Sequence, residues 1–264
     1  MLQTTRTTSV RRLFVLLCGF EILPKTVSTR DSGGRFILSE PVCAYLLDTD
    51  SGWILLDTGF NADNGRDRER MRTRFWDAGM TAPVIRRDHL LEPQLAEIGV
   101  ALRDIGWVIL SHLHYDHCGN LPLLAHARIS VQRREYEHAF RAHASRGYFR
   151  DEYDDPRLAW DLRDGDWEAQ PGLRLIDTCG HTPGHQSAVI TLPRTGTVVL
   201  PFDAGDLLEN FDKEVLPGES CDDAAALLAI RRIKAITTEE RALLLLFHDP
   251  AEIQRIRLSP LCYT

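Results

Sequence analysis

The stretch "SHLHYDHCGN" at residues 111–120 places three histidines and an aspartate within six positions. Without a partner, so many neighbouring imidazole and carboxylate groups would repel one another or shift their pKa values strongly. A divalent cation removes this conflict, because neutral imidazoles and carboxylates can share it as ligands. His112 and His114 are one residue apart, so in an extended segment both side chains point to one side. Asp116 and His117 follow and can turn toward a second position, so one short loop could supply two neighbouring metal ions.

Three more titratable residues, His181, Asp203 and His248, each follow an apolar run typical of a strand. Strand ends converge on one edge of an open sheet, where loops build binding sites. His181 can complete one metal position and His248 the other, while Asp203 can bridge them, with Asp206 as the competing candidate. This arrangement leaves coordination positions open for water, which is typical of a catalytic metal site. The nitrogen and oxygen ligands suit Zn, Mn, Fe or Co.

Other polar residues near these segments are interpreted as supporting residues. We expect Asp57 to hold the metal-binding loops and His185 to orient the loop of His181. Cys118 has no matching cysteine for a thiolate site, so we predict that it packs in the core. Four further histidines are expected at the surface, namely His89, His126, His138 and His143.

Hydrophobic periodicity and turn residues predict alternating strands and helices. Segments 42–49 and 53–59 form a predicted hairpin around the turn "DSG", and 147–160, broken by Pro156, is expected to be irregular. The run 11–20 is predicted to be a buried strand rather than a signal peptide, because it is short and lacks a cleavage site. Further strands are expected at 107–110, 128–132, 173–178, 188–192, 197–206 and 242–250, and helices at 90–100, 133–144 and 222–236. This order indicates mixed sheets covered by helices.

Residues 61–88 are rich in arginine and aspartate and contain a few large apolar side chains. Two interpretations stay open: a solvated excursion, or a loop that covers a substrate. Several apolar residues could border a substrate pocket or equally pack in the core, namely Phe75, Trp76, Met80, Tyr148 and Phe149.

The composition of the 264-residue chain is that of an ordinary globular protein, with 44% hydrophobic and 26% charged residues. Its formal net charge of −7 argues against a nucleic-acid-binding protein, and its apolar runs are too short to predict a membrane span. The six cysteines form no CxxC pair, so we expect a reduced, cytoplasmic protein. Length alone suits one large domain or two halves that share a core.

These motifs resemble the metallo-β-lactamase superfamily. "SHLHYDHCGN" matches its HxHxDH signature, "DTG" at 57–59 its first motif, and "GHTPGH" at 180–185 its third. Within the superfamily the chain is most similar to the N-acyl-homoserine lactonases, through stretches between about residues 41 and 250 that include "PVCAYLLDT", "VQRREYEHAF", "DAGDLLENF" and "FHDP". The resemblance implies an αββα sandwich of two mixed sheets flanked by helices, formed as a single domain over residues 1–264. A homodimer is plausible on the same basis.

The resemblance also implies two divalent metal ions per chain, zinc first among the candidates. The first ion would be held by His112, His114, His181 and Asp203, and the second by Asp116, His117, His248 and Asp203. In such a lactonase a metal-bridging hydroxide would attack the carbonyl of a small lactone. Asp203 or Asp206 would pass a proton to the leaving alkoxide. The expected catalytic residues are therefore Asp116, Asp203 and Asp206.

One position departs from the lactonase pattern. Lactonases of this group usually carry a tyrosine three residues after the bridging aspartate, and here that position is Asp206. An anionic carboxylate cannot donate a hydrogen bond to a developing oxyanion. Either a metal alone stabilises that oxyanion, or Tyr115 or another group substitutes, or the substrate is not a simple acyl lactone.

Two other functions stay open beside the lactonase. A hydrolase of another ester, thioester or lactone, glyoxalase-II-like or γ-butyrolactonase-like, could use the same scaffold, as could one that acts on phosphodiesters or β-lactams. A glyoxalase-II-like enzyme would be expected to show basic residues near the motifs, and none is obvious. A non-catalytic metal-binding protein would be expected to have lost ligands, whereas every ligand position is filled.

Overall fold

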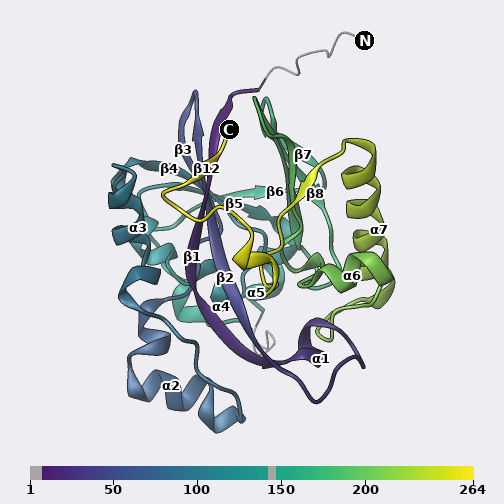
Figure 1. Ribbon diagram of the computed structural model, residues 1–264. Coiled ribbons are helices and arrows are strands. Elements are labelled where there is room, and N and C mark those ends of the chain that lie inside the picture. The colour runs from purple at the N-terminus through teal and green to yellow at the C-terminus, as the bar shows by residue number, and fades with distance from the viewer. Residues whose placement is uncertain (1–7, 142–146) are drawn as a thin grey trace.

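A computed structural model describes residues 8–141 and 147–264, and shows two β-sheets packed face to face with helices on both outer faces (Figure 1). His143 and the end of the predicted helix 133–144 lie outside the described residues. The first sheet has the order β12-β1-β2-β3-β4-β5-β6. Its strands are β1 (Val10–Pro24), β2 (Ile37–Thr49), β3 (Gly52–Leu56), β4 (Ile105–Ile109), β5 (Arg128–Gln132), β6 (Ala159–Arg163) and β12 (Cys262–Tyr263).

The second sheet has the order β11-β10-β9-β8-β7. Its strands are β7 (Trp167–Gln170), β8 (Leu173–Asp177), β9 (Gln186–Leu192), β10 (Gly196–Leu200) and β11 (Leu243–Leu244). Both sheets are mixed. In the first sheet β3, β4, β5 and β6 pair in parallel, whereas β1 with β2 and β2 with β3 pair antiparallel. In the second sheet β10 pairs in parallel with β11 and antiparallel with β9. The sandwich of two mixed sheets predicted from the sequence is confirmed.

Seven helices are described, of which α3 lies on the outer face of the first sheet and α7 on that of the second (Figure 1). They are α1 (Lys25–Ser28), α2 (Arg68–Arg74), α3 (Leu91–Glu97), α4 (Tyr115–Cys118), α5 (Arg133–Ala139), α6 (Leu208–Lys213) and α7 (Asp223–Glu239). No helix in the described part of the chain has the length and apolar character needed to cross a bilayer.

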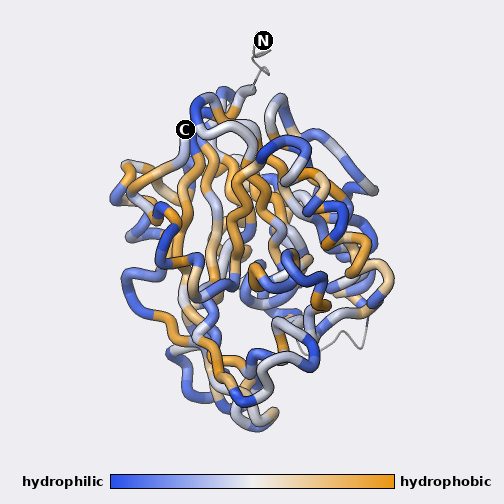
Figure 2. The backbone as a smooth tube through the Cα atoms, turned by 45° about the vertical axis from the view of Figure 1, so that its right-hand side comes forward, coloured by the Kyte–Doolittle hydropathy of each residue, from blue (hydrophilic) through white to orange (hydrophobic). Residues whose placement is uncertain are grey.

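Alternation along the strands of the second sheet creates two cores. In β9, Ala188 and Ile190 face the first sheet, whereas Val189 between them faces α7. On the helix side, Ile230 and Ile233 are fully buried against this outer face, and burial of each such side chain contributes about 1.5–3 kcal/mol. Figure 2 shows the resulting pattern, with hydrophobic segments gathered along the central strands and hydrophilic segments in the surrounding helices and loops.

Two predicted strands are shorter than expected. The run 197–206 stops being a strand at Leu200, because Pro201 has no N–H to continue the ladder. The chain then makes a short 3₁₀ turn over Phe202–Ala204, where Phe202 has a φ of 48°. The run 242–250 forms only the two-residue strand β11. Both deviations place an expected metal ligand in a loop just beyond a strand.

The prediction of a surface position is wrong for His89, which is only 3% exposed. Residues 61–88 fold back onto β1, where Phe20 and Val84 exchange two backbone hydrogen bonds of 3.1 and 2.8 Å. The imidazole of His89 consequently packs edge-on against the ring of Phe20, and its Nδ1 accepts a hydrogen bond from the backbone N–H of Arg86. His126 is exposed as predicted, whereas His138 is half-buried.

Candidate dinuclear metal centre

The histidine-rich loop begins directly after the central strand β4. Its first part is extended, and α4 then forms a single helical turn in which the N–H groups of His117 and Cys118 both donate to the carbonyl of His114 at 3.0 Å. This change of backbone direction separates the side chains of the loop into two groups. His112 and His114 precede the turn, while Asp116 and His117 lie within it.

Seven residues that the sequence nominated as metal ligands come together here in two groups. The ligand atoms within each group all lie within 4.8 Å of one another. One group consists of His112, His114, His181 and Asp203, and the other of Asp116, His117, His248 and Asp203. Asp206 belongs to neither group, so the geometry favours Asp203 as the bridging carboxylate.

Asp203 directs one carboxylate oxygen toward each group. Its Oδ2 lies 3.2 Å from Nε2 of His181 and 3.6 Å from Nε2 of His112. Its Oδ1 lies 3.2 Å from Nε2 of His117 and 3.5 Å from Nε2 of His248. A carboxylate placed in this way can hold two cations at once.

Three buried atoms of these groups, Nε2 of His112, Nε2 of His117 and Oδ1 of Asp203, have no hydrogen-bond partner among the described residues. A buried polar atom without a partner costs about 1–3 kcal/mol. A divalent cation would relieve this cost, because it accepts the lone pairs of imidazole nitrogens and carboxylate oxygens. The residues present therefore fit a dinuclear metal centre.

The protonation of the ligands differs between the two groups. Burial lowers the pKa of His112 well below its usual range and that of His114 to about 3, so both rings are neutral and keep a lone pair for a metal. Burial also opposes protonation of His248. There, however, the carboxylates of Asp203, Asp206 and Asp116 outweigh burial and raise the pKa to about 10. A metal ion entering the second group must therefore displace a proton.

Asp57 lies behind the histidine-rich loop, as predicted, and belongs to neither group. It is fully buried, and its Oδ2 lies 2.8 Å from Nδ1 of His117. The backbone N–H and the hydroxyl of Ser111 also donate to Asp57, at 2.7 and 2.8 Å. The hydrogen bond to Nδ1 leaves Nε2 of His117 available as the ligand atom.

His185 supports the loop of His181, as expected, and also the bridging aspartate. Its Nε2 accepts a hydrogen bond of 3.1 Å from the backbone N–H of Asp203, and its Nδ1 lies 3.1 Å from the carbonyl oxygen of Thr178. Burial lowers the pKa of His185 to about 3, so the ring is neutral and can accept at Nε2 while it donates at Nδ1. His185 therefore fixes the bridging aspartate and, through its contacts with Thr178, also joins the two ends of the loop that carries His181.

Glu135 is a supporting residue that the sequence analysis missed. Its carboxylate is fully buried and accepts four hydrogen bonds of 2.7–3.1 Å. At Oε1 the donors are the N–H of Leu113 and the hydroxyl of Tyr148, and at Oε2 they are the hydroxyl of Thr182 and the N–H of Gly184. One side chain thus joins the loop of His112 and His114 to the loop of His181.

Replacing Glu135 by Gln should weaken metal binding without removing any ligand. The amide group of glutamine would face two of the four donors and leave them unpaired, at a cost of about 2–3 kcal/mol in unfolding free energy. Because the two loops would lose their fixed spacing, we expect metal affinity to fall about 10- to 100-fold. Competition titration with a chelator and denaturant unfolding measure the two effects. Glu137→Gln, at an exposed position of the same helix, is the matched control. Equal metal affinity in both variants would contradict this role.

A cavity of about 510 Å³ opens onto the two metal-binding groups. His114, Asp116, His181, Asp203 and His248 all line it. Further walls come from the end of β1, from β2 and from the excursion at residues 78–81. The excursion is therefore part of the cavity wall as well as a partly solvated segment.

The predicted pocket residues divide between cavity and core. Met80 lines the cavity, whereas Trp76 is 44% exposed outside its wall. Phe75 and Phe149 pack against the ring of Tyr115. Tyr148 is different again, because its ring packs edge-on against the ring of His114.

Asp206, which stands at the tyrosine position of the lactonase pattern, and Tyr115, the named candidate to substitute for that tyrosine, also line the cavity. Burial raises the pKa of Asp206 well above its usual range. The hydroxyl of Tyr115 donates to the buried carboxyl group of Glu21. Its single proton is thus already engaged, which disfavours Tyr115 as the substitute for the missing tyrosine.

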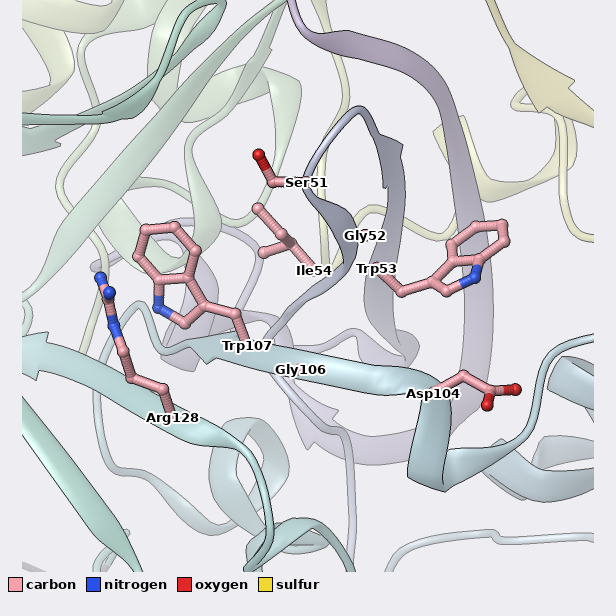
Figure 3. Close-up of a pocket in the computed structure, with 8 residues that line it drawn as sticks. All are labelled: Ser51, Gly52, Trp53, Ile54, Asp104, Gly106, Trp107 and Arg128. Carbon is pink, nitrogen blue, oxygen red and sulfur yellow. The ribbon is translucent and has the colours of Figure 1, made fainter.

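A second, smaller hollow of about 260 Å³ lies at the opposite end of β4, near Asp104 and Gly106 (Figure 3). There the guanidinium group of Arg128 lies 3.8 Å from the ring centroid of Trp107, and the side chain of Trp53 points away from this pair. No residue of the two metal-binding groups lines this hollow. Among the described residues, the candidate active site therefore lies in the larger cavity.

Comparison with known proteins agrees with this geometry. Residues 40–254 match the model of the metallo-beta-lactamase superfamily. The chain is 32% identical to an N-acyl homoserine lactonase of Bacillus cereus over 256 residues, which cover 96% of this chain and 98% of that protein. It is 31% identical over 186 residues to the N-acyl homoserine lactonase AttM of Azorhizobium caulinodans, covering 67% of this chain and 71% of that protein.

Solved structures show the same likeness. The crystal structure of a quorum-quenching N-acyl homoserine lactone lactonase superposes with a TM-score of 0.85 at 30% identity, covering 98% of this chain and all of that one. An N-acyl homoserine lactone hydrolase with the product N-hexanoyl-L-homoserine bound at its catalytic metal centre gives 0.85 at 31% identity, covering 97% and 100%. The chain therefore belongs to the metallo-beta-lactamase superfamily and is a metal-dependent hydrolase similar to the N-acyl homoserine lactonases.

Proposed function

We propose that this protein opens the ring of a lactone by hydrolysis, with N-acyl homoserine lactones as the first class to test. The observation that carries the proposal is the complete pair of ligand groups at the floor of the 510 Å³ cavity. Its support also comes from the likeness to lactonases over nearly the whole chain, one of which holds a ring-opened product at its metal centre.

The chain's own residues have separate tasks in this reaction. When bound, two divalent ions supply a nucleophile at neutral pH and polarise the carbonyl group that it attacks. Asp203 sets the spacing of the two groups, because its two oxygens face different histidines. Asp116 holds the second group, with its Oδ2 lying 3.0 Å from Nε2 of His117 and 3.5 Å from Nε2 of His248. Asp203 or Asp206 would accept the proton that the attacking nucleophile gives up and pass it to the alkoxide as the ring C–O bond breaks, which leaves a carboxylate and an alcohol.

Apolar side chains in the cavity wall suit the acyl chain of such a substrate. Ile22, Leu23, Val27, Ile37 and Met80 line this part of the wall. Burial of an acyl chain against them would contribute about 0.8 kcal/mol per CH₂ group. We therefore expect longer acyl chains to lower KM more than they raise kcat.

The test is a pH-stat assay of ring opening with metal content measured in the same samples. Acyl homoserine lactones of several chain lengths and γ-butyrolactone form the panel. Turnover that requires metal and depends on chain length supports the proposal. Absence of turnover for every lactone, with two ions bound, would exclude this substrate class.

A thioester or another ester is the second candidate, because the same ligand groups and cavity could act on either. Among the residues that line the described cavity there is no Lys or Arg to bind an anionic group such as that of glutathione. This absence from the described wall favours the lactone over a glutathione thioester. Glutathione thioesters added to the same panel test this directly.

Substituting tyrosine for Asp206 should raise lactonase activity if the departure from the lactonase pattern is a handicap. A tyrosine hydroxyl at this position could donate a hydrogen bond to the developing oxyanion, and one such donor is worth about 10²–10³ in kcat at the upper limit. Because a tyrosine is larger than an aspartate, we expect a smaller gain, of about tenfold. Steady-state kinetics on the best lactone measures it. A fall in kcat at unchanged metal content would instead mean that Asp206 has its own role in turnover.

A further inference from the structure

The loop between α6 and α7, residues 214–222, contains none of the predicted metal ligands but contacts one of them directly. Nδ1 of His181 lies 3.0 Å from the backbone carbonyl oxygen of Glu219. A carbonyl oxygen can only accept a hydrogen bond, so Nδ1 carries the N–H of the ring and Nε2 keeps its lone pair. This Nε2 lies 3.2 Å from Oδ2 of the bridging Asp203. The main chain of the α6–α7 loop therefore selects the ligand atom of His181.

The same loop also holds the main chain around His181. The N–H of Cys221 points at two carbonyl oxygens, those of Gly180 at 2.8 Å and His181 at 3.2 Å. The N–H of Asp222 donates to Gly180 as well, at 3.1 Å. Gly180 packs so closely here that a Cβ would lie 2.3 Å from the backbone nitrogen of Ala226 in α7. The ring and the main chain of this ligand are thus fixed by one segment.

The position of the α6–α7 loop is set in turn by α1, which lies beside it (Figure 1). The N–H of Gly218 donates to the carbonyl oxygen of Val27 at 2.7 Å, and Val27 lines the cavity. A Cβ on Gly218 would lie only 1.9 Å from the carbonyl oxygen of Thr26. Because no real Cβ makes so short a contact, any larger residue at 218 must push the loop away from α1.

Arg30, just after α1, holds the same loop at further points. Its backbone N–H donates to the carbonyl oxygen of Leu216 at 2.9 Å. Its guanidinium group donates to the hydroxyl of Ser220 at 2.9 Å and to the carboxylate of Asp223 at 2.5 Å. The loop is therefore joined to the cavity wall on one side and to a metal ligand on the other.

The second metal-binding group is fixed by other segments. Nδ1 of His248 lies 3.0 Å from the carbonyl oxygen of Pro41 on β2. Nδ1 of His117 lies 2.8 Å from Oδ2 of Asp57. A displacement of the α6–α7 loop should consequently reach the first group, through His181, and spare the second.

We propose that the α6–α7 loop is a positioning element for the first metal site, in which Gly218 seats the loop on α1 so that the carbonyl of Glu219 holds His181 in the orientation that binds the ion. The inference depends on the dinuclear centre but not on the choice of a lactone as substrate. Gly218 is the critical residue, because only glycine fits against the main chain of Thr26.

Cobalt binding to one group at a time tests this proposal. His248→Ala leaves the four ligands of the first group intact, and His181→Ala leaves those of the second. In the His248→Ala background, adding Gly218→Ala should lower the affinity for Co²⁺ about 10- to 100-fold, measured by titrating the visible absorption of the bound ion. In the His181→Ala background, the same substitution should change the affinity by less than about twofold.

Two further variants make the comparison specific. Gly106→Ala is the matched control, because a Cβ at this exposed position of β4 meets nothing within 4 Å, and it should change neither affinity. Arg30→Ala releases the loop without inserting an atom, so it serves if Gly218→Ala does not fold. It should lower the affinity of the first group alone, by about threefold or more. Thermal unfolding of each variant checks that it is folded.

The comparison between the two backgrounds decides the outcome. A loss of Co²⁺ affinity confined to the first group, in either loop variant, supports the positioning role. Losses of equal size in both backgrounds, or no loss in either, for both loop variants would overturn it. Because this measurement uses no substrate, it is independent of the lactonase assay. A confined loss in a protein that opens no lactone would leave the positioning role standing and reject the proposed function alone.

Discussion

Replacing Asp203 by Asn should abolish most of the activity and reduce the metal content below two ions per chain. Asparagine preserves the shape of the side chain but removes its charge and replaces one carboxylate oxygen by an N–H₂ group that cannot bind a metal. Because one oxygen of Asp203 faces each ligand group, both positions lose an anionic ligand. We expect kcat/KM to fall by at least about 100-fold, equivalent to about 2.7 kcal/mol of transition-state stabilisation.

Metal analysis and steady-state kinetics on the same preparation test this expectation. Asp212→Asn, at an exposed position of α6, controls for the loss of one negative charge. If the Asp203 variant kept two ions per chain, the bridging role would pass to Asp206. The same pair of measurements on Asp206→Asn would then decide between the two carboxylates.

Removing the metal should eliminate activity and lower the melting temperature, and the size of the second effect should depend on pH. In the metal-free protein the pKa of His248 is raised to about 10 by the surrounding carboxylates, against an unfolded value near 6.5. A raised pKa in the folded state contributes stability that is complete below about pH 6.5 and is lost as the pH rises toward 10. The metal-free protein should therefore lose stability over this range.

Metal affinity changes in the opposite direction, because a metal ion must displace the proton from His248 and does so more readily as the pH rises. The difference in melting temperature between loaded and metal-free protein should consequently widen between about pH 6 and pH 9. Differential scanning calorimetry at several pH values, before and after chelation, measures this difference. Re-addition of zinc, manganese, iron or cobalt should restore both activity and stability, and the most effective ion identifies the preferred metal. A constant difference across this pH range would contradict the proposed displacement of a proton.

The ligand set could be anticipated from the sequence because four of its members lie within one six-residue stretch. The other three follow apolar segments, and the end of a strand can be recognised without knowing its length. This is why Asp203 and His248 fall in the two groups with the loop residues although the strands before them were predicted too long. Pro201, which ends β10, was visible in the sequence and could have given the shorter boundary.

Residues that act through burial could not be anticipated in the same way. Glu135 falls in a segment that reads as the polar face of a helix, and its partners are 13 to 49 positions away in the chain. The burial of His89 depends on residues 61–88 folding back onto β1. The pairing of the buried carboxyl groups of Glu21 and Glu40 depends on the register of β1 and β2, since only that register places the two residues opposite each other. None of these pairings has a signature in local composition or periodicity.

The bridging position of Asp203 also has a consequence for how the protein is made. During synthesis the first four ligands leave the ribosome together, but each ion needs partners that appear only with His181, Asp203 and His248. Those partners are set by the second sheet, so neither site can close until nearly the whole chain has emerged and that sheet has docked. Metal capture is therefore expected to be a late event in maturation. A released chain truncated near residue 130 would display four ligands and still release its metal readily.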